Sequence, residues 1–197
     1  MQRRDALRLL ASAPLAAGFA WTDAEATEAL QRASAAREAA PAGASYTPKF
    51  FSEHEYQTVR ALVDVIIPRD ERSGSATDAG VPEFMDFIVG DQPARQTAMR
   101  GGLAWLDREC VVRFDKPFVS CTAQEQTAVL DDIAWPERAR PELAAGVAFF
   151  NSFRDLTAAG FYTSKMGIED LQYRGNTYVR TWNGCPDEAC KKLGVSY

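Results

Sequence analysis

The residues of this sequence that could do chemistry are a single histidine, four cysteines and several pairs of adjacent carboxylates. His54, as the only histidine, rules out a catalytic or metal site that needs two imidazoles. It lies in the first turn of a predicted helix, where an exposed or helix-packing role is the expected one. A Ser-His-Asp arrangement built through His54 is therefore not expected.

The cysteines favour disulfide bonds over metal binding. Spacings of eleven and five residues do not form the CxxC pairs of a zinc site. Four cysteines allow three disulfide connectivities, and an oxidising compartment permits them. Cys110 and Cys121 flank a predicted helix–helix connection that a bridge could close. Cys185 and Cys190 would pair poorly if Pro186 starts a helix, because five residues then rise about 7.5 Å, so a bridge there needs a non-helical turn.

Neither the carboxylates nor the known sequence motifs indicate an active site. Asp131 and Asp132 are adjacent in a predicted helix, where neighbouring side chains point in different directions, so a solvated face explains them; the pair Asp70 and Glu71 is interpreted in the same way. The sequence contains no GxGxxG, GxxxxGK[ST], GxSxG or CxxCH motif. We therefore expect no catalytic, cofactor-binding or metal-binding residue in this chain.

Composition indicates one globular domain and excludes a nucleic-acid partner. The chain has 197 residues, with 46% hydrophobic and 25% charged residues, which are ordinary globular values. Its net charge is −5 and its basic residues are scattered among acidic ones. Binding to phosphates needs a basic face, which this pattern does not supply.

The chain begins MQRRDALRLLASAPLAAGFA, a basic stretch ahead of a short apolar run. A membrane-spanning helix needs about 20 apolar residues, and this run is shorter and broken by Pro14 and Gly18. The order of basic, apolar and small residues is typical of an export signal. Arg3 and Arg4 favour the twin-arginine route, which moves folded proteins. We expect residues 1–26 to be a twin-arginine-type signal segment, with an ordinary secretory signal as the alternative.

The remaining sequence divides into a linker and a helical domain. Residues 27–45 are rich in Ala and Glu with few large apolar side chains, so they have little to bury and are expected to form a linker. Residues 46–197 are expected to form the domain. Its start carries a capping box, Ser52 with Glu55, ahead of apolar residues at helical spacing that end at Pro68.

Four further helices are predicted by the same signals. The second begins at Pro82, the third runs to Phe114 despite the Gly101-Gly102 pair, the fourth follows the capping box of Thr122, and the fifth starts near Pro141. Strand-like alternation is nearly absent. The predicted fold is an all-α, small irregular bundle of about five helices with an aromatic-rich irregular C-terminal tail.

The tail beyond Gly160 mixes turn residues with large aromatic side chains. Such residues either pack back onto their own bundle or anchor a partner, because Tyr and Trp bury much area while keeping a polar group. The candidate interface residues are Phe161, Tyr162, Tyr173, Tyr178 and Trp182.

Several stretches, taken in order, resemble one known family. They are the twin-arginine-like start, FFSEHEYQTVRALVDVIIPRDE, AGVPEFMDFI and GFYTSKMGIEDLQYRGN. In this order and spacing the chain resembles the small subunit, subunit 3, of the gluconate 2-dehydrogenase family. The likeness covers most of the sequence after the signal segment.

The resemblance implies a partner that performs the chemistry. In that family the small subunit accompanies a large flavoprotein of the glucose–methanol–choline type, often with a multihaem cytochrome c. The partner oxidises a sugar or sugar acid on FAD, and electrons pass to haem c and the respiratory chain. FAD is inserted in the cytoplasm, so a flavoprotein without its own signal must cross folded, and a bound subunit bearing Arg3 and Arg4 would carry it.

These implications place the chain in the periplasm, or on the periplasmic face of the inner membrane through its signal segment or its partner. Two other classes of function stay open at this point. One is a free-standing periplasmic helical module for binding or scaffolding. The other is a small all-α enzyme that uses a bound ligand.

Overall fold

The computed structural model describes residues 28, 31, 32, 35, 46–173, 175, 180, 181 and 184–195. Within these residues the chain is all-helical and contains no strand, which confirms the predicted fold class. The seven helices labelled in this part, with two short 3-10 turns, are α3 (Glu53–Ile66), α4 (Val81–Gly90), α5 (Pro93–Phe114), η1 (Phe118–Ser120), α6 (Ala123–Ala134), η2 (Pro141–Leu143), α7 (Ala144–Tyr162), α8 (Lys165–Asp170) and α9 (Asp187–Leu193).

Both predicted capping boxes are present at the starts of their helices. At α3 the Ser52 hydroxyl accepts from the backbone N–H of Glu55, and the Glu55 carboxylate accepts from the backbone N–H of Ser52. Thr122 and Glu125 make the same exchange at α6. Each box satisfies backbone donors that a helix start leaves without intrahelical partners, which is why these boundaries could be predicted from sequence.

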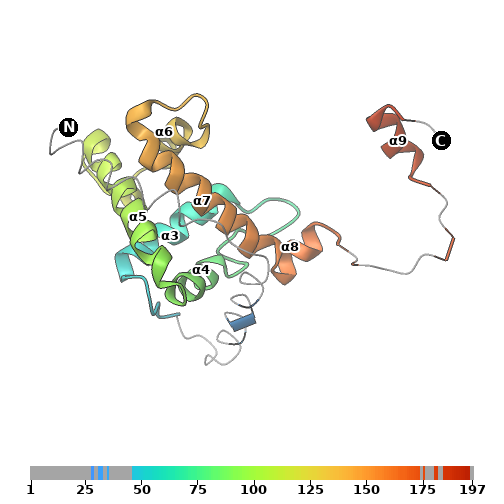
Figure 1. The fold of residues 1–197 in the computed structure, drawn as a ribbon, viewed down its shortest axis with the longest axis horizontal. Coiled ribbons are helices and arrows are strands. Elements are labelled where there is room, and N and C mark those ends of the chain that lie inside the picture. The colour runs from blue at the N-terminus through green and yellow to red at the C-terminus, as the bar shows by residue number, and fades with distance from the viewer. Residues whose placement is uncertain are drawn as a thin grey trace.

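The five predicted helices correspond to α3, α4, α5, α6 and α7, but the C-terminal tail is more regular than expected. It contains α8 and α9, helices of 6 and 7 residues. Such short helices complete fewer than two turns, so they leave no apolar periodicity to detect. Figure 1 shows α8 directly following α7 at the edge of the bundle and α9 lying apart from it.

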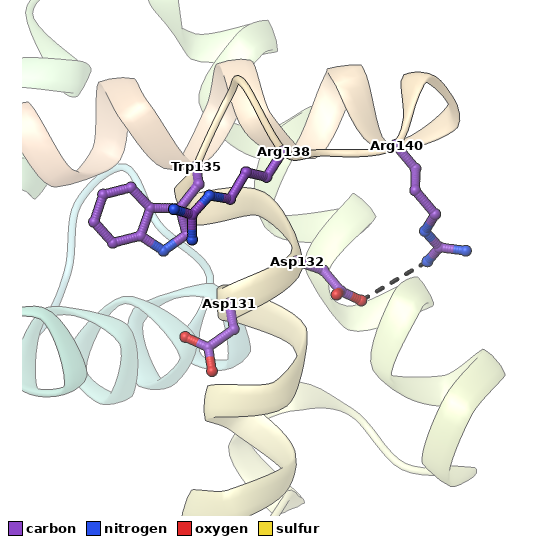
Figure 2. Close-up of a pocket in the computed structure, with 5 residues that line it drawn as sticks. All are labelled: Asp131, Asp132, Trp135, Arg138 and Arg140. Carbon is purple, nitrogen blue, oxygen red and sulfur yellow. Dashed lines mark ion pairs between the residues drawn. The ribbon is translucent and has the colours of Figure 1, made fainter.

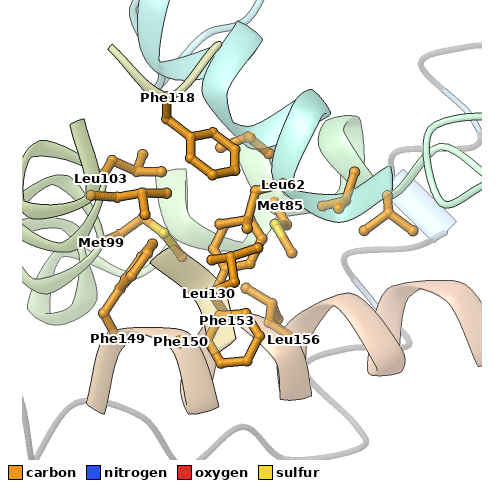
Figure 3. Packing of buried hydrophobic residues seen from close by; sticks show 14 of the residues in the cluster. Leu62, Met85, Met99, Leu103, Phe118, Leu130, Phe149, Phe150, Phe153 and Leu156 are labelled. Atoms are coloured by element: carbon orange, nitrogen blue, oxygen red, sulfur yellow. The ribbon is translucent and has the colours of Figure 1, made fainter. Parts of the chain in front are cut away.

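Helix α7 is the centre of the bundle, because it contacts α3, α4, α5, α6 and α8. Figure 3 shows side chains from α3, α4, α5, η1 and α6 gathered with those of α7. The core residues that it labels are Leu62, Met85, Met99, Leu103, Phe118, Leu130, Phe149, Phe150, Phe153 and Leu156. All are buried, and burial of this apolar surface supplies the main favourable term in folding.

The close crossing of α5 and α7 explains one residue of the Gly101-Gly102 pair in the third predicted helix. A Cβ at Gly102 would lie 1.9 Å from the Phe149 ring of α7, whereas a Cβ at Gly101 would meet nothing within 4 Å. In return, a Cβ at Gly146 of α7 would lie 2.1 Å from the Trp105 ring of α5. Each helix thus receives an aromatic ring of the other where it has no side chain.

A buried carboxylate holds the segment that leads into α3. Asp86 of α4 accepts hydrogen bonds on Oδ1 from the backbone N–H groups of Phe50 (3.0 Å) and Phe51 (2.9 Å). Its Oδ2 accepts from the backbone N–H of Lys49 and from the Tyr46 hydroxyl, both at 2.7 Å. Burial, and then the hydrogen bond to Asp86, raise the pKa of Tyr46, so its hydroxyl remains a donor at neutral pH.

We expect Asp86→Ala to lower the free energy of unfolding by about 3 kcal/mol, because it leaves four donors without their charged acceptor. Tyr46→Phe removes one of the four bonds and should cost about 1 kcal/mol. Urea denaturation followed by circular dichroism measures both. Equal midpoints for the two variants would contradict the anchoring role of Asp86.

Candidate partner interface

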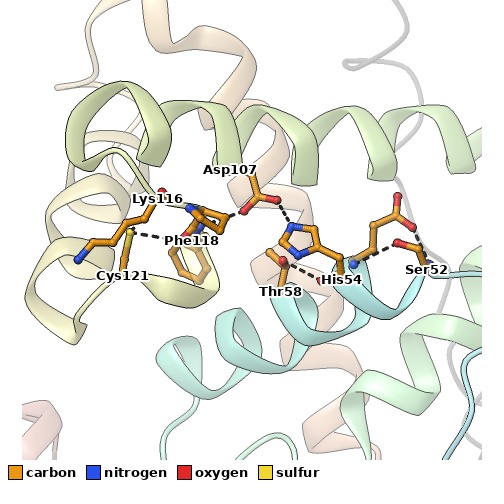
Figure 4. A network of polar contacts seen from close by, with 9 residues as sticks. Ser52, His54, Thr58, Asp107, Lys116, Phe118 and Cys121 are labelled. Carbon is orange, nitrogen blue, oxygen red and sulfur yellow. Dashed lines mark hydrogen bonds and ion pairs between the residues drawn. The ribbon is translucent and has the colours of Figure 1, made fainter.

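His54 lies in the first turn of α3 and takes part in a polar network between helices (Figure 4). Its Nε2 lies 2.6 Å from Oδ2 of Asp107 on α5, and Oδ1 of the same carboxylate accepts from the backbone N–H of Phe118 at 3.0 Å. The hydroxyl of Ser52, in the same turn, caps α3. The histidine therefore links α3 to α5 and η1, and the neighbouring serine is committed to the helix start.

The carboxylates of α6 do not form an acid–base couple. Asp132 pairs with Arg113 (2.7 Å) and Arg140 (3.7 Å), while Asp131 points in another direction from the same helix (Figure 2). The exposed Trp135, at the end of α6, has the Arg138 guanidinium 5.9 Å from its ring centroid. An open pocket of about 330 Å³ lies at this end of α6, and it is lined by Asp131, Asp132, Trp135, Arg138 and Arg140.

The described residues hold neither a metal-binding cluster nor a helix suited to cross a membrane. They contain no group of three or more His, Cys, Asp or Glu side chains placed to hold a metal ion. No helix in the same part of the chain combines the length and the apolar character that a membrane crossing requires.

The end of α7, together with α8, carries a group of exposed apolar side chains. We call it the α7–α8 surface, formed by Tyr162, Ile168, Leu171 and Tyr173, whose exposed fractions are 42%, 39%, 56% and 65%. Exposed apolar side chains that gather on one surface can mark a protein interaction site.

The five candidate interface residues differ in their exposure to solvent. Tyr162 and Tyr173 lie on the α7–α8 surface. Phe161 is 1% exposed and packs in the core, so the prediction that its side chain is open to a partner is wrong. Phe161 supports the surface from below, since its ring meets that of Tyr162 edge-on at 5.2 Å between centroids. Tyr178 and Trp182 lie outside the described residues.

Ile168 and Leu171 were missed because they are not aromatic. The sequence carried one local signal of this helix, because Ser164 is a residue type that caps helix starts. In the structure the Ser164 hydroxyl accepts from the backbone N–H of Gly167 at 3.1 Å and donates to the Phe161 carbonyl at 2.6 Å. These bonds fix the start of α8 against the end of α7.

The C-terminal end of α8 is closed by a pair of hydrogen bonds that positions Tyr173. The backbone N–H of Tyr173 donates to the Ile168 carbonyl (3.1 Å), and that of Gln172 donates to the Glu169 carbonyl (3.0 Å). Gln172 has a positive φ of 53°, and this geometry is a Schellman motif, in which the side chains at these two ends commonly touch. The backbone of Tyr173 is thereby held beside that of Ile168.

An ion pair joins α8 to the loop between α3 and α4. Arg72 donates to the backbone carbonyl of Asp170 at 2.5 Å and pairs with its carboxylate at 2.9 Å. The loop between α3 and α4 thus holds α8 in place. The α7–α8 surface is therefore held in place before a partner binds. This lowers the entropic cost of ordering it on binding.

Among known proteins, one family profile, described as gluconate 2-dehydrogenase subunit 3, matches residues 53–183. The match runs from the first residue of α3 into the C-terminal tail and so includes the whole α7–α8 surface. No curated protein and no solved structure matched the sequence. Since the match spans well over half of the chain, this protein belongs to the gluconate 2-dehydrogenase subunit 3 family, the small subunits of dehydrogenase complexes.

Proposed function

We propose that this chain is the non-catalytic small subunit of an exported FAD-dependent sugar or sugar-acid dehydrogenase. It binds a large flavoprotein of the glucose–methanol–choline type and supports its folding, assembly and twin-arginine export to the periplasm. The observation that carries this proposal is the α7–α8 surface, which lies inside the segment matched by a family of dehydrogenase small subunits.

The chemistry of the surface suits a permanent protein partner. Two tyrosines flank two aliphatic side chains, and aromatic anchors surrounded by apolar contacts are typical of the centre of an interface. Tyrosine adds a hydroxyl that can pair with the partner when its ring is buried. A flavoprotein docked here would cover side chains that otherwise cost free energy in water.

The export part of the proposal depends on the N-terminal sequence. Arg3 and Arg4 stand ahead of an apolar run, and the twin-arginine route accepts folded cargo. A flavoprotein must bind FAD before it crosses, so a folded complex is the form that this route would carry. FAD then belongs to the large subunit, and haem c to a cytochrome subunit where the complex contains one.

The direct test is to isolate the tagged chain from the periplasmic and membrane fractions of its native host. A co-purified larger protein with flavin absorbance and sugar-dependent reduction of a dye would support the proposal and identify the substrate. A colourless chain that stays folded without a partner would contradict it and favour the free-standing helical module.

Two substitutions on the α7–α8 surface test where the flavoprotein docks. We expect Leu171→Asp and Tyr173→Ala each to reduce the recovery of the flavoprotein at least about 10-fold, since a buried anchor contributes about 2 kcal/mol. Both side chains are exposed, so the melting temperature of the isolated chain should change little. Quantitative pull-down and thermal unfolding measure the two effects.

Val112→Asp is the matched control, because Val112 is an exposed aliphatic residue on another helix, α5. It should leave the recovery of the flavoprotein unchanged. An equal loss with Val112→Asp, or an equal loss of folding in the Leu171 and Tyr173 variants, would contradict docking at the α7–α8 surface.

A further inference from the structure

Trp135 is a large aromatic side chain that the bundle leaves open to water. It directly follows α6 and is 61% exposed. A tryptophan that packs inside a protein buries roughly 150–250 Å² of surface, so an exposed indole forgoes much favourable burial. The ring is therefore available as a contact for a molecule outside the chain.

The backbone around Trp135 holds the ring in one place. Pro136 disfavours a helical conformation for the residue before it, and Trp135 is extended, with φ −117° and ψ 93°. Its carbonyl accepts hydrogen bonds from the backbone N–H groups of Arg138 (2.9 Å) and Ala139 (3.0 Å). These bonds close the turn after α6, so little entropy is lost when a ligand contacts the ring.

Two of the four charged side chains around Trp135 are already paired. Asp132 binds Arg113 at 2.7 Å and Arg140 at 3.7 Å. The other two, Asp131 and Arg138, are exposed and form no ion pair within the part of the chain that the structure describes. The Arg138 guanidinium lies 5.9 Å from the centroid of the indole ring. One carboxylate and one guanidinium are therefore available beside the ring.

These three side chains face one pocket. Asp131 precedes Trp135 by four residues, which places the two on neighbouring turns of the same helix side. Figure 2 shows Asp131 on the side of α6 that carries the indole, with Arg138 beside the ring and Asp132 directed away toward Arg140. Together they line the open pocket of about 330 Å³ at the end of α6.

The chemistry of the pocket favours a neutral ligand that carries hydroxyl groups. A carboxylate only accepts hydrogen bonds and a guanidinium only donates them, whereas a hydroxyl does both. The lining side chains carry two negative and two positive charges, so no net charge attracts an ion. The flat indole suits the apolar C–H face of a ring.

We propose that this pocket binds a neutral monosaccharide, with the sugar ring on Trp135 and its hydroxyls on Asp131 and Arg138. The pocket volume is near the lower end of the roughly 300–1,000 Å³ of known ligand sites, which fits a single ring. Because the pocket is open, water competes for both charged groups, and we expect a Kd of about 1–10 mM. The proposal concerns this chain alone and does not depend on its docking to a flavoprotein.

The test uses the full chain labelled with fluorotryptophan and observed by fluorine NMR. The sequence has four tryptophans, Trp21, Trp105, Trp135 and Trp182, and Trp135→Phe identifies the signal of Trp135 by its loss. The probes are the methyl glycosides of glucose, galactose and mannose. Glycerol, acetate and methylammonium are titrated as controls for a hydroxyl compound without a ring, an anion and a cation.

We expect a saturable shift of the Trp135 signal with at least one glycoside and none with the three controls. Saturation transfer to the glycoside protons then gives the affinity of each variant. Trp135→Ala should weaken binding at least about 10-fold, and Asp131→Asn and Arg138→Gln at least about 5-fold each. All three side chains are exposed, so the melting temperature should change little.

Tyr173→Ala is the matched control, since Tyr173 is another exposed aromatic residue, 65% exposed and outside this pocket. It should leave glycoside binding unchanged. A Trp135 signal that no glycoside shifts would overturn the proposal and leave the ring as an anchor for a protein partner. An equal shift with glycerol, acetate or methylammonium, or equal losses in Trp135→Ala and Tyr173→Ala, would also overturn it. None of these measurements uses the flavoprotein, so failure of this inference and failure of the proposed function are distinguishable.

Discussion

Gly102→Ala is expected to lower the free energy of unfolding by about 3 kcal/mol and the melting temperature by about 10 °C. The added methyl group would stand 1.9 Å from Cδ2 and 2.3 Å from Cγ of Phe149, far inside the roughly 3.5 Å separation of carbon atoms in contact. Phe149 is fully enclosed and packs against Phe153 with 5.5 Å between ring centroids. The ring has no free space to enter, so α5 and α7 must move apart.

Gly101→Ala is the matched control, because it makes the same change one residue earlier in the same helix. Its Cβ meets nothing within 4 Å, and alanine is favoured over glycine inside a helix by about 0.5–1 kcal/mol. We expect this variant to melt about 2–4 °C higher than the natural chain. Differential scanning calorimetry measures both, and shifts of the same sign would contradict the close crossing of α5 and α7.

Replacement of Arg3 and Arg4 by lysine is expected to abolish export while leaving the complex active. Lysine keeps the positive charge but lacks the planar guanidinium, and a twin-arginine receptor reads the arginine pair itself. The flavoprotein should therefore accumulate in the cytoplasm at least about 10-fold above its normal share, with its dehydrogenase activity intact. Cell fractionation with dye-linked activity assays measures this distribution.

Arg8→Lys provides the control for a general effect of arginine loss. It preserves the pair and the basic character of the segment, so export should continue. An ordinary secretory signal needs positive charge and not arginine as such. Normal export of the double lysine variant would therefore contradict the twin-arginine assignment and the model in which the small subunit carries its partner.

Local signals made the first five helices predictable. The capping boxes at Ser52 and Thr122, the stop at Pro68 and the apolar spacing each act over a few residues, so they survive without knowledge of the fold. The expectation of no active site in this chain also came from the sequence, which has one histidine and lacks the common catalytic motifs. The resemblance to the subunit 3 family came from the order of such local stretches, and the family match confirms it.

The candidate interface was only partly predictable, because composition marks side-chain types and not their exposure. Phe161 and Tyr162 are neighbours with similar rings, yet the first is 1% and the second 42% exposed. Their difference depends on which side of α7 meets the core. Ile168 lies in a helix too short to show periodicity, and Leu171 directly follows it. Arg72, which holds that helix, lies almost a hundred residues earlier in the chain.

The sequence by itself determined the helical class, the capped starts of α3 and α6, and the family to which the chain belongs. Each of these rests on interactions between residues a few positions apart or on composition. Only the tertiary structure decided that Gly102 receives the Phe149 ring, that Asp86 anchors the entry to α3, and that Arg72 holds α8. These contacts depend on how helices cross, and helix crossing is set by the packing of the whole bundle.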